Sequence, residues 1–365
     1  MKEDKIPISR IHPKFTLNGQ SYAKESLRRL AHNFIEQGEP YEEAVGAFIL
    51  DWLNDKKYVM VRTSGSTGAP KAIKIKKRHM VNSAKATAKH FKLPAETTAL
   101  LCLPVDFIAG KMMLVRALVL GWHIDMTQPK ANPLDTLYKR YDFCAMTPFQ
   151  VDNSLSRMHL LSKLIIGGGV ISSNLKLRLQ NLSTKVYETY GMTETVTHIA
   201  ARRVNPKKPK EAPVPFKALA KVSIEQDERG CLVIKAPAVS SDPVVTNDLI
   251  DIVTYKKFIW LGRVDNVINS GGIKLFPEQI EQKLEPFMEV PFFIGGVQDD
   301  ALGECVALFV EQEAPFSLRK DEVINEVLER YEFPKLIYEV VRFERTANGK
   351  IKRSQTITKA INLQQ

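Results

Sequence analysis

The sequence has few residues that could form disulfides or bind a transition metal. Its 365 residues include four widely spaced cysteines, and its seven histidines form neither a His-x-His nor a His-Glu-x-x-His pattern. A disulfide framework and a zinc site both need sets of neighbouring ligands, so these absences argue against both. We expect the cysteines to be reduced, buried thiols of a cytoplasmic protein.

Long hydrophobic runs are also absent. The best candidate, Met112 to Ile124, is shorter than the roughly 18–20 residues needed to span a bilayer, and it contains Arg116. The first ten residues, MKEDKIPISR, lack the apolar stretch of a secretory signal. We therefore expect neither a membrane span nor export.

Acidic residues are outnumbered by basic ones, 41 against 52, which gives a net charge of +11. This excess permits polyanionic partners, from nucleic acids to phosphorylated small molecules. The densest basic stretch, with Lys71, Lys74, Lys76, Lys77 and Arg78, has no interleaved aromatic residues that would stack on bases. A nucleic-acid-binding protein is therefore the distant alternative, and we expect no nucleic-acid partner.

The pattern of apolar residues predicts an α/β fold in two parts, which the length also suggests. Two amphipathic helices are expected between Leu27 and Leu53, followed by strands that end in glycine or proline before helices. This rhythm is typical of parallel βαβ packing, which places ligands at the carboxyl ends of the strands. We predict an N-terminal α/β domain over 1–264, with a distorted β region from about 205, and a small C-terminal α+β lid domain over 265–365. The expected later strands are 58–62, 72–76, 99–103, 143–146, 164–166, 185–187, 258–261, 292–297, 306–310 and 337–343, and the expected later helices are 77–90, 110–120, 277–284 and 319–329.

The segment 63–71 has the composition of a phosphate-binding loop. Its glycines allow close approach of the backbone to an anion, successive N–H groups can form a nest, and Lys71 adds charge. An ordinary solvated loop of similar composition is an equal alternative on these residues alone. The loop is not a P-loop of the GxxxxGK[ST] type, because Ala72 follows the lysine. The candidate phosphate ligands are Thr63, Ser64, Gly65, Ser66, Thr67, Gly68 and Lys71.

A second segment, 187–194, could serve a nucleotide. The ring of Tyr190 could stack on a base, Gly191 would allow a tight turn, Thr193 could donate to a phosphate and Glu194 could bind Mg²⁺. Taken alone, a plain Tyr-Gly turn with a solvated glutamate is the better explanation of this segment.

Two further segments are ambiguous in the same way. Asp248 and Arg263 could bind ribose hydroxyls, or they could form a surface ion pair of little consequence. Lys350 follows Asn348-Gly349, a strong turn signal, and could be presented to a site or simply face solvent.

Together and in this order, the motifs from about 58 to 354 resemble those of the adenylate-forming superfamily of acyl-CoA synthetases, luciferases and peptide-synthetase adenylation domains. The resemblance implies that 63–71 holds the ATP phosphates and that Tyr190 stacks on adenine. It further implies that Thr193 contacts the α-phosphate and that Glu194 binds Mg²⁺. The glycines expected to border the adenine are Gly167, Gly168 and Gly169.

The same resemblance assigns the remaining motif residues. Asp248 and Arg263 would hold the ribose, and Asp265 would be the hinge between the domains. Ser270, with Gly271 and Gly272, would line the path of the pantetheine arm of coenzyme A. Lys350 would be the lysine of the adenylation step. The implied cofactors are ATP, Mg²⁺ and coenzyme A. Relatives usually have a longer segment before the phosphate loop, so the first subdomain is expected to be reduced here.

The acid is the least determined part of this prediction. The segments 108–116 and 146–150 are most similar to those of o-succinylbenzoate–CoA ligases of menaquinone biosynthesis, whose substrate has two carboxylates. Arg116 lies in an otherwise apolar helix, where it could bind the second carboxylate, extend its charge to solvent or pair within the protein. Lys111 is the other candidate, although a helix would place it about 140° away from Arg116.

Several alternatives stay open on the sequence alone. They are a ligase for another aryl or medium-chain acid, an adenylation enzyme that loads a carrier protein, and a silent relative, against which Glu194 and Lys350 argue. Association into a homo-oligomer is compatible with the sequence.

Overall fold

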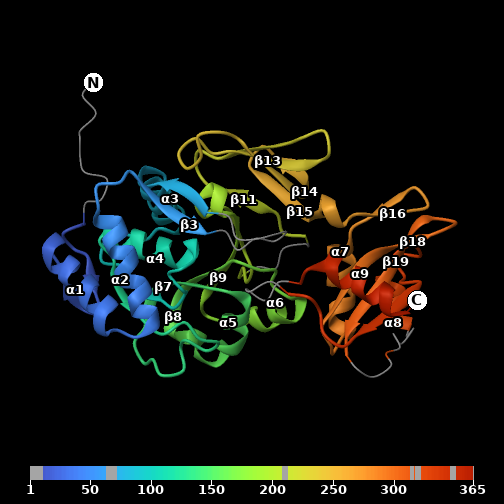
Figure 1. The fold of residues 1–365 in the computed structure, drawn as a ribbon, viewed down its shortest axis with the longest axis horizontal. Helices are drawn as coiled ribbons and strands as arrows, with labels where there is room; N and C mark the ends of the chain where they lie inside the picture. Colours follow the sequence, from blue (N-terminus) through green and yellow to red (C-terminus); the bar gives the residue numbers. More distant parts are fainter. Residues whose placement is uncertain are drawn as a thin grey trace.

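The computed structural model describes residues 11–62, 72–207, 213–312, 316, 322–345 and 351–364. Within these residues, thirteen strands form one sheet in the order β12-β13-β14-β15-β11-β10-β9-β8-β7-β5-β6-β1-β2. Figure 1 shows this sheet in the middle of the molecule. Its strands are β1 (Thr16–Leu17), β2 (Gln20–Ser21), β5 (Thr98–Leu101), β6 (His123–Met126), β7 (Tyr141–Met146), β8 (Leu161–Ile166), β9 (Lys185–Gly191), β10 (His198–Arg203), β11 (Phe216–Ala218), β12 (Ser223–Gln226), β13 (Cys231–Lys235), β14 (Val244–Thr254) and β15 (Lys257–Arg263).

The centre of the sheet is parallel and covered on both faces. Strands β6, β5, β7, β8 and β9 pair in parallel, as expected from the rhythm of the sequence. Along β7, Phe143 and Ala145 pack into one buried cluster, whereas Cys144 and Met146 pack into the other. The first cluster includes α3 (Lys77–Phe91) and α4 (Ile108–Leu120), and the second includes α6 (Ser173–Leu179) and residues of α5 (Pro148–Asn153). This arrangement confirms the predicted α/β class.

The N-terminal helices, α1 (Lys24–Gln37) and α2 (Pro40–Leu53), lie at one end of the molecule (Figure 1). Pro40 occupies the first turn of α2, where its missing N–H costs nothing. A separate hairpin of β3 (Tyr58–Arg62) and β4 (Ala72–Lys76) follows, as predicted. None of the helices within the described ranges combines the length and the apolar character needed to cross a bilayer.

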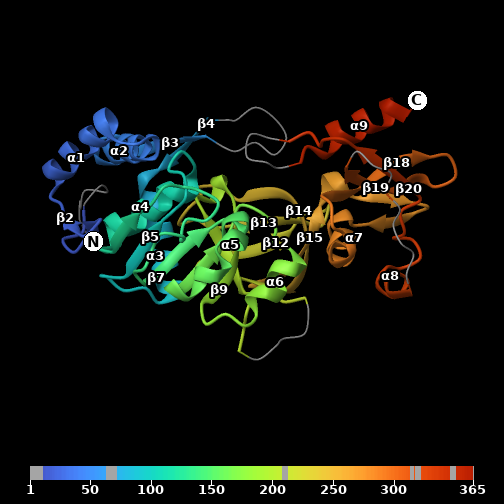
Figure 2. The ribbon, with the colours of Figure 1, turned by 90° about the horizontal axis from the view of Figure 1, so that it is seen from below.

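A second sheet lies at the opposite end (Figure 2). Its described strands are β16 (Ile268–Ser270), β17 (Ile273–Leu275), β18 (Phe292–Asp299), β19 (Gly303–Glu311) and β20 (Leu336–Val340). Along β19, Val306 and Leu308 pack toward α7 (Pro277–Leu284) and α8 (Glu322–Val327), whereas Ala307 and Phe309 pack toward α9 (Arg353–Gln364). The sheet is therefore covered on both faces. The division of the chain into domains at Asp265 stays a prediction.

The structure corrects four details of the sequence interpretation. The strand expected over 99–103 ends at Leu101, and the strand expected to reach 343 ends at Val340. The strand from Lys185 continues through Gly191 instead of ending before a turn there. Helix α9 was not predicted, because its sequence is rich in threonine and polar residues and shows only a weak apolar stripe.

Candidate active site

The carboxyl ends of the parallel strands bring two predicted nucleotide segments together. Gly167 follows β8 directly, and the hydroxyl of Thr189 on β9 donates to the carbonyl of Ile166 at 2.9 Å. A Cβ on Gly167 would lie 3.0 Å from that hydroxyl, so glycine permits the close packing. Gly168 has a φ of +82°, which favours glycine. The glycine turn thus lies beside the residue that precedes Tyr190.

Tyr190 links the central sheet to the hairpin of β14 and β15. Its hydroxyl donates to Asp248 Oδ2 at 2.5 Å, and its ring lies 5.3 Å from that of Phe258 and 5.9 Å from that of Phe216. Trp260 Nε1 donates to the other oxygen, Asp248 Oδ1, at 3.2 Å. Burial, with the nearby carboxylate, raises the pKa of the Tyr190 hydroxyl, so it stays a donor. Tyr190, predicted for the adenine, and Asp248, predicted for the ribose, are therefore directly connected.

Arg263 stands opposite Asp248 in the register of β14 and β15, but its guanidinium turns to Asp265 at 2.7 Å. Among the described residues, the alternative of an Asp248–Arg263 ion pair is therefore wrong. Asn247 Nδ2 donates to both oxygens of Asp265, at 3.1 and 3.2 Å. The hydrogen bond from Arg263 lowers the pKa of the Asp265 carboxyl. These contacts fix the backbone between the two sheets at Asp265.

Gly262, next to Arg263, is required by packing. Its φ is +151°, and a Cβ there would lie 2.4 Å from Glu278 Oε2 on α7. Asn266 Nδ2 donates to the other carboxylate oxygen, Glu278 Oε1, at 2.5 Å. The end of β15 and the start of α7 therefore touch directly at the predicted hinge.

Thr193 and Glu194 lie in a short 3₁₀ turn, η2 (Thr193–Thr195), just after β9. The Glu194 side chain is exposed and makes no hydrogen bond or ion pair with the described residues. No cluster of three or more acidic, histidine or cysteine ligands occurs in the part of the chain that the structure describes. A single free carboxylate fits Mg²⁺ bound mainly through substrate phosphates and water, and it does not fit a protein cage for a metal.

Gly191 does not make the tight turn that the sequence predicted. It ends β9 opposite His198 of β10, and a Cβ there would lie 2.4 Å from the carbonyl oxygen of Thr197. Glycine is needed because the two backbones approach closely. Gly271 and Gly272, in contrast, do form a turn: they join β16 to β17 with φ values of +57° and +84°.

Two predicted groups lie outside the described residues. They are the phosphate loop 63–71 and Lys350. Strands β3 and β4, which flank the loop, are described and pair in the register Arg62↔Ala72, so the loop begins and ends at one end of this hairpin.

Arg116 is buried in α4 without a carboxylate. It is 1% exposed, and within the described ranges no acidic side chain forms an ion pair with it. Its Nε donates to Thr87 Oγ1, Nη2 to Thr197 Oγ1 and Nη1 to Met113 Sδ, each at 3.4 Å. Burial lowers the pKa of the guanidinium to about 9, still above neutral pH. The solvent-directed and ion-paired alternatives for Arg116 are therefore both wrong.

Lys111 is not brought to the same group. Its Nζ donates to the carbonyl of Val105 at 2.5 Å and lies 5.1 Å from the centre of the Phe48 ring. Burial lowers the pKa of this ammonium group. Lys111 and Arg116 thus have different neighbours, as the helical geometry predicted, and a contact between Lys111 and substrate stays a prediction.

The sequence did not point to His198, which completes the surroundings of Arg116. The imidazole is 7% exposed, with Nε2 at 3.3 Å from Thr87 Oγ1 and Nδ1 at 3.4 Å from Thr197 Oγ1. Burial, reinforced by the charge of Arg116, holds the pKa of His198 well below its usual range. Only the position of His198, four residues after Glu194, could have suggested a role. The sequence analysis also missed Trp260 and Asn247, because no spacing in the sequence indicates that either residue belongs to a site.

Comparisons with known proteins show what this chain is similar to. The family model described as AMP-binding enzyme matches residues 31–241. A crystallised acyl-CoA synthetase (AMP-forming)/AMP-acid ligase II-like protein from Dyadobacter fermentans is 35% identical; the match covers 91% of this chain and 98% of that one, with a TM-score of 0.60.

More distant relatives are named for the same acid. The 2-succinylbenzoate–CoA ligase of Staphylococcus epidermidis is 24% identical over 335 residues, which are 82% of this chain and 69% of that protein. The o-succinylbenzoate coenzyme A synthetase of Bacillus subtilis, solved with ATP and magnesium, is 19% identical. Its TM-score is 0.72, and the match covers 92% of this chain and 82% of that one. At this identity the second similarity shows the fold alone.

Proposed function

Because this chain belongs to the family of AMP-binding enzymes, we propose that it is the ligase that joins o-succinylbenzoate to coenzyme A at the expense of ATP. Membership in the family confirms the resemblance and the class of AMP-forming acid–thiol ligases expected from the sequence. It also favours an enzyme over the nucleic-acid-binding alternative. The names of the curated relatives support the acid and its place in menaquinone biosynthesis.

The observation that carries the choice of acid is the lone charge of Arg116. A buried guanidinium without a counter-ion is costly, so we infer that Arg116 serves a partner that the described part of the chain does not supply. A substrate with two carboxylates supplies this counter-ion. Its succinyl carboxylate reacts, and its aromatic carboxylate binds Arg116. Benzoate and medium-chain acids have no second anion to offer.

The nucleotide would bind across the carboxyl ends of β8 and β9. Adenine would lie between the turn of Gly167–Gly169 and the ring of Tyr190, and the ribose hydroxyls would reach Asp248 and Arg263. Each Asp248 oxygen accepts one hydrogen bond in the structure and keeps a further lone pair. The loop 63–71 would take the β- and γ-phosphates, as the sequence suggests.

The chemistry follows from the poor reactivity of a carboxylate toward thiols. Attack of the carboxylate oxygen on the α-phosphorus forms an acyl adenylate and breaks the bond to pyrophosphate. The coenzyme A thiol then attacks the acyl carbon, forms the thioester and releases AMP. Thr193 and Lys350 would donate to the phosphate oxygens on which charge grows. Glu194 would hold Mg²⁺, which supplies further positive charge at the phosphates when bound.

We place the hinge at Asp265, between a domain over 1–264 and a lid over 265–365. The support is local: Asp265 is fixed by Arg263 and Asn247, and Gly262 contacts Glu278 of α7. One pocket must serve two reactions, and a lid that presents first Lys350 and then the Gly271–Gly272 turn would meet that need.

The test is pyrophosphate release with ATP, Mg²⁺ and coenzyme A on o-succinylbenzoate, benzoate and octanoate, with products identified by mass. We expect strong preference for o-succinylbenzoate and formation of its coenzyme A thioester. Turnover of benzoate or octanoate instead would support the ligase chemistry and contradict the assignment of o-succinylbenzoate as the substrate. Adenylate formation without transfer to free coenzyme A would favour the carrier-loading alternative.

A further inference from the structure

The surroundings of Arg116 form a closed ring of hydrogen bonds. Thr87 of α3 and Thr197, just before β10, each accept from the guanidinium, and each hydroxyl also contacts one nitrogen of His198. The His198 imidazole therefore closes the ring on the side opposite Arg116. The four groups come from three parts of the chain: α3, α4 and the consecutive residues Thr197 and His198.

The available protons fix the state of His198. The Thr87 hydroxyl donates its only proton to the Ser83 carbonyl at 3.0 Å, so toward His198 Nε2 it accepts. Nε2 then carries the imidazole proton, and Nδ1 is left to accept from the Thr197 hydroxyl. In this arrangement both threonine oxygens turn lone pairs to Arg116. A doubly protonated His198 would leave the Thr197 proton without this acceptor.

The same count shows what Arg116 still lacks. Of its five N–H groups, three are used by Thr87, Thr197 and Met113. One N–H on each terminal nitrogen has no acceptor among the residues that the structure describes. A carboxylate can accept from two N–H groups of one guanidinium with its two oxygens.

From these contacts we propose that His198 is the positioning residue that makes the acid site select a second carboxylate. Neutral His198 orients the hydroxyls of Thr87 and Thr197 as acceptors for Arg116. The hydroxyls solvate the positive charge of Arg116 without neutralising it. An acidic residue in its place would provide the counter-ion internally and remove the need for the substrate anion. This proposal rests on the proposed function, because it assumes that the second carboxylate is that of the acid substrate.

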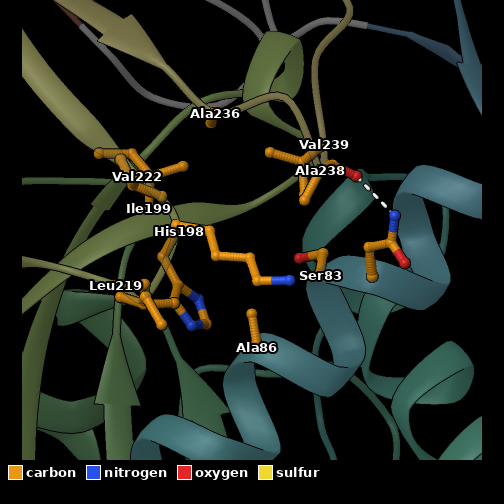
Figure 3. A pocket seen from close by; sticks show the side chains of 12 residues that line it. Ser83, Ala86, His198, Ile199, Leu219, Val222, Ala236, Ala238 and Val239 are labelled. Atoms are coloured by element: carbon orange, nitrogen blue, oxygen red, sulfur yellow. Dashed lines mark hydrogen bonds between the residues drawn. The ribbon is translucent and has the colours of Figure 1, made fainter.

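The charges around His198 reinforce its neutrality. Arg116 of α4 and His90 of α3 both lower its pKa, after burial as the main cause. Lys221 lines the cavity on which His198 borders. Ser83 and Leu219 line the same cavity (Figure 3). None of the described groups that face His198 is acidic, so nothing in this part of the protein favours the imidazolium.

The test compares two acids that differ only at the second anion. They are o-succinylbenzoate and 4-(2-methylphenyl)-4-oxobutanoate, in which a methyl group replaces the aromatic carboxylate. kcat and KM for pyrophosphate release are measured for the wild type, His198→Leu, His198→Gln and the control His90→Gln. Glutamine keeps one donor and one acceptor, whereas leucine keeps only the size.

We expect His198→Leu to lower kcat/KM for o-succinylbenzoate by about 10–100-fold, mainly through KM, and to leave kcat/KM for the methyl analogue within about threefold. His198→Gln should recover most of the lost kcat/KM. His90→Gln should change kcat/KM for neither acid. Equal losses of kcat/KM for both acids in His198→Leu would show that His198 has a merely structural role and would overturn the proposal. The assignment of o-succinylbenzoate as the substrate would still hold. A wild type that uses the methyl analogue as well as o-succinylbenzoate would overturn both the selectivity and the proposed substrate.

Discussion

Arg116 carries the functional argument at the scale of single residues. A buried charge is normally paired, and this one is met by two hydroxyls and a thioether instead, with a neutral imidazole bound to the same hydroxyls. Such an arrangement lowers stability when no ligand is bound. The first prediction follows from that cost.

Arg116→Met should stabilise the unliganded protein and impair its use of a dicarboxylate. Removing an uncompensated buried charge should raise the free energy of unfolding by about 1–3 kcal/mol. Loss of the carboxylate contact should lower kcat/KM for o-succinylbenzoate roughly 10²–10³-fold. Urea unfolding and pyrophosphate release measure the two effects. A variant that is less stable than the wild type would show that Arg116 is a structural residue.

The neutrality of His198 predicts how stability depends on pH. Its pKa in the folded protein is well below that of the unfolded chain, about 6.5, so the unfolded chain binds more protons as the pH falls. The free energy of unfolding should therefore decrease below pH 6.5, by up to about 1.4 kcal/mol per pH unit from this group. His198→Gln should flatten the curve measured by urea unfolding between pH 5.5 and 7.5. Parallel curves for the two proteins would mean that His198 binds a proton as readily in the folded protein as in the unfolded chain.

At the scale of elements, one loop would serve both halves of the proposed site. The segment between β9 and β10 carries Thr193 and Glu194, which we assign to the nucleotide, and Thr197, which contacts Arg116. Its Val196 is buried with a φ of +67°, a conformation that costs energy for a β-branched residue. The close pairing of Gly191 with His198 holds the two ends of this loop together.

Gly191→Ala should therefore damage the loop. The added Cβ would lie 2.4–2.7 Å from backbone atoms of Thr197 and His198. The paired strands cannot easily move apart to make room for it. We expect a loss of about 1–3 kcal/mol in the free energy of unfolding, measured by urea titration. Gly169→Ala is the matched control, because its Cβ would make only ordinary contacts with Pro148 at 3.6 Å or more. If both variants lost equal stability, close approach would not be the reason for Gly191.

The sequence predicted β5, β7, β8, β9, α3 and α4 of the parallel core from their apolar patterns and the glycines and prolines between them. It did not predict β6, α5 or α6. It could not predict the ring around Arg116, since Thr87, Thr197 and His198 come together only when α3, α4 and β10 pack. It also misplaced the role of Gly191, because a backbone that approaches across a sheet leaves no local pattern. Helix α9 was missed since β-branched Thr356, Ile357 and Thr358 weaken helix propensity, and packing on the second sheet overrides it.

At the scale of the molecule, the proposed lid divides the two half-reactions. Lys350→Ala should reduce acyl adenylate and pyrophosphate formation roughly 10²–10³-fold and leave conversion of preformed adenylate to thioester nearly intact. Rapid-quench assays of each half-reaction measure the split. Lys352→Ala is the control: it removes a nearby lysine, whose backbone N–H donates to Glu344, and should alter neither step. Equal losses of both steps in Lys350→Ala would remove the reason for a lid that changes position.

The central claim is that Arg116 binds the second carboxylate of the acid. A crystal structure of the protein with a non-hydrolysable sulfamoyl analogue of the o-succinylbenzoyl adenylate measures this directly. We predict that both aromatic carboxylate oxygens lie at about 2.7–3.2 Å from the terminal nitrogens of Arg116, with Thr87 and Thr197 still in place. An aromatic carboxylate that faces solvent, or that pairs with Lys111 or Lys221 while Arg116 stays without an anion, would contradict the account.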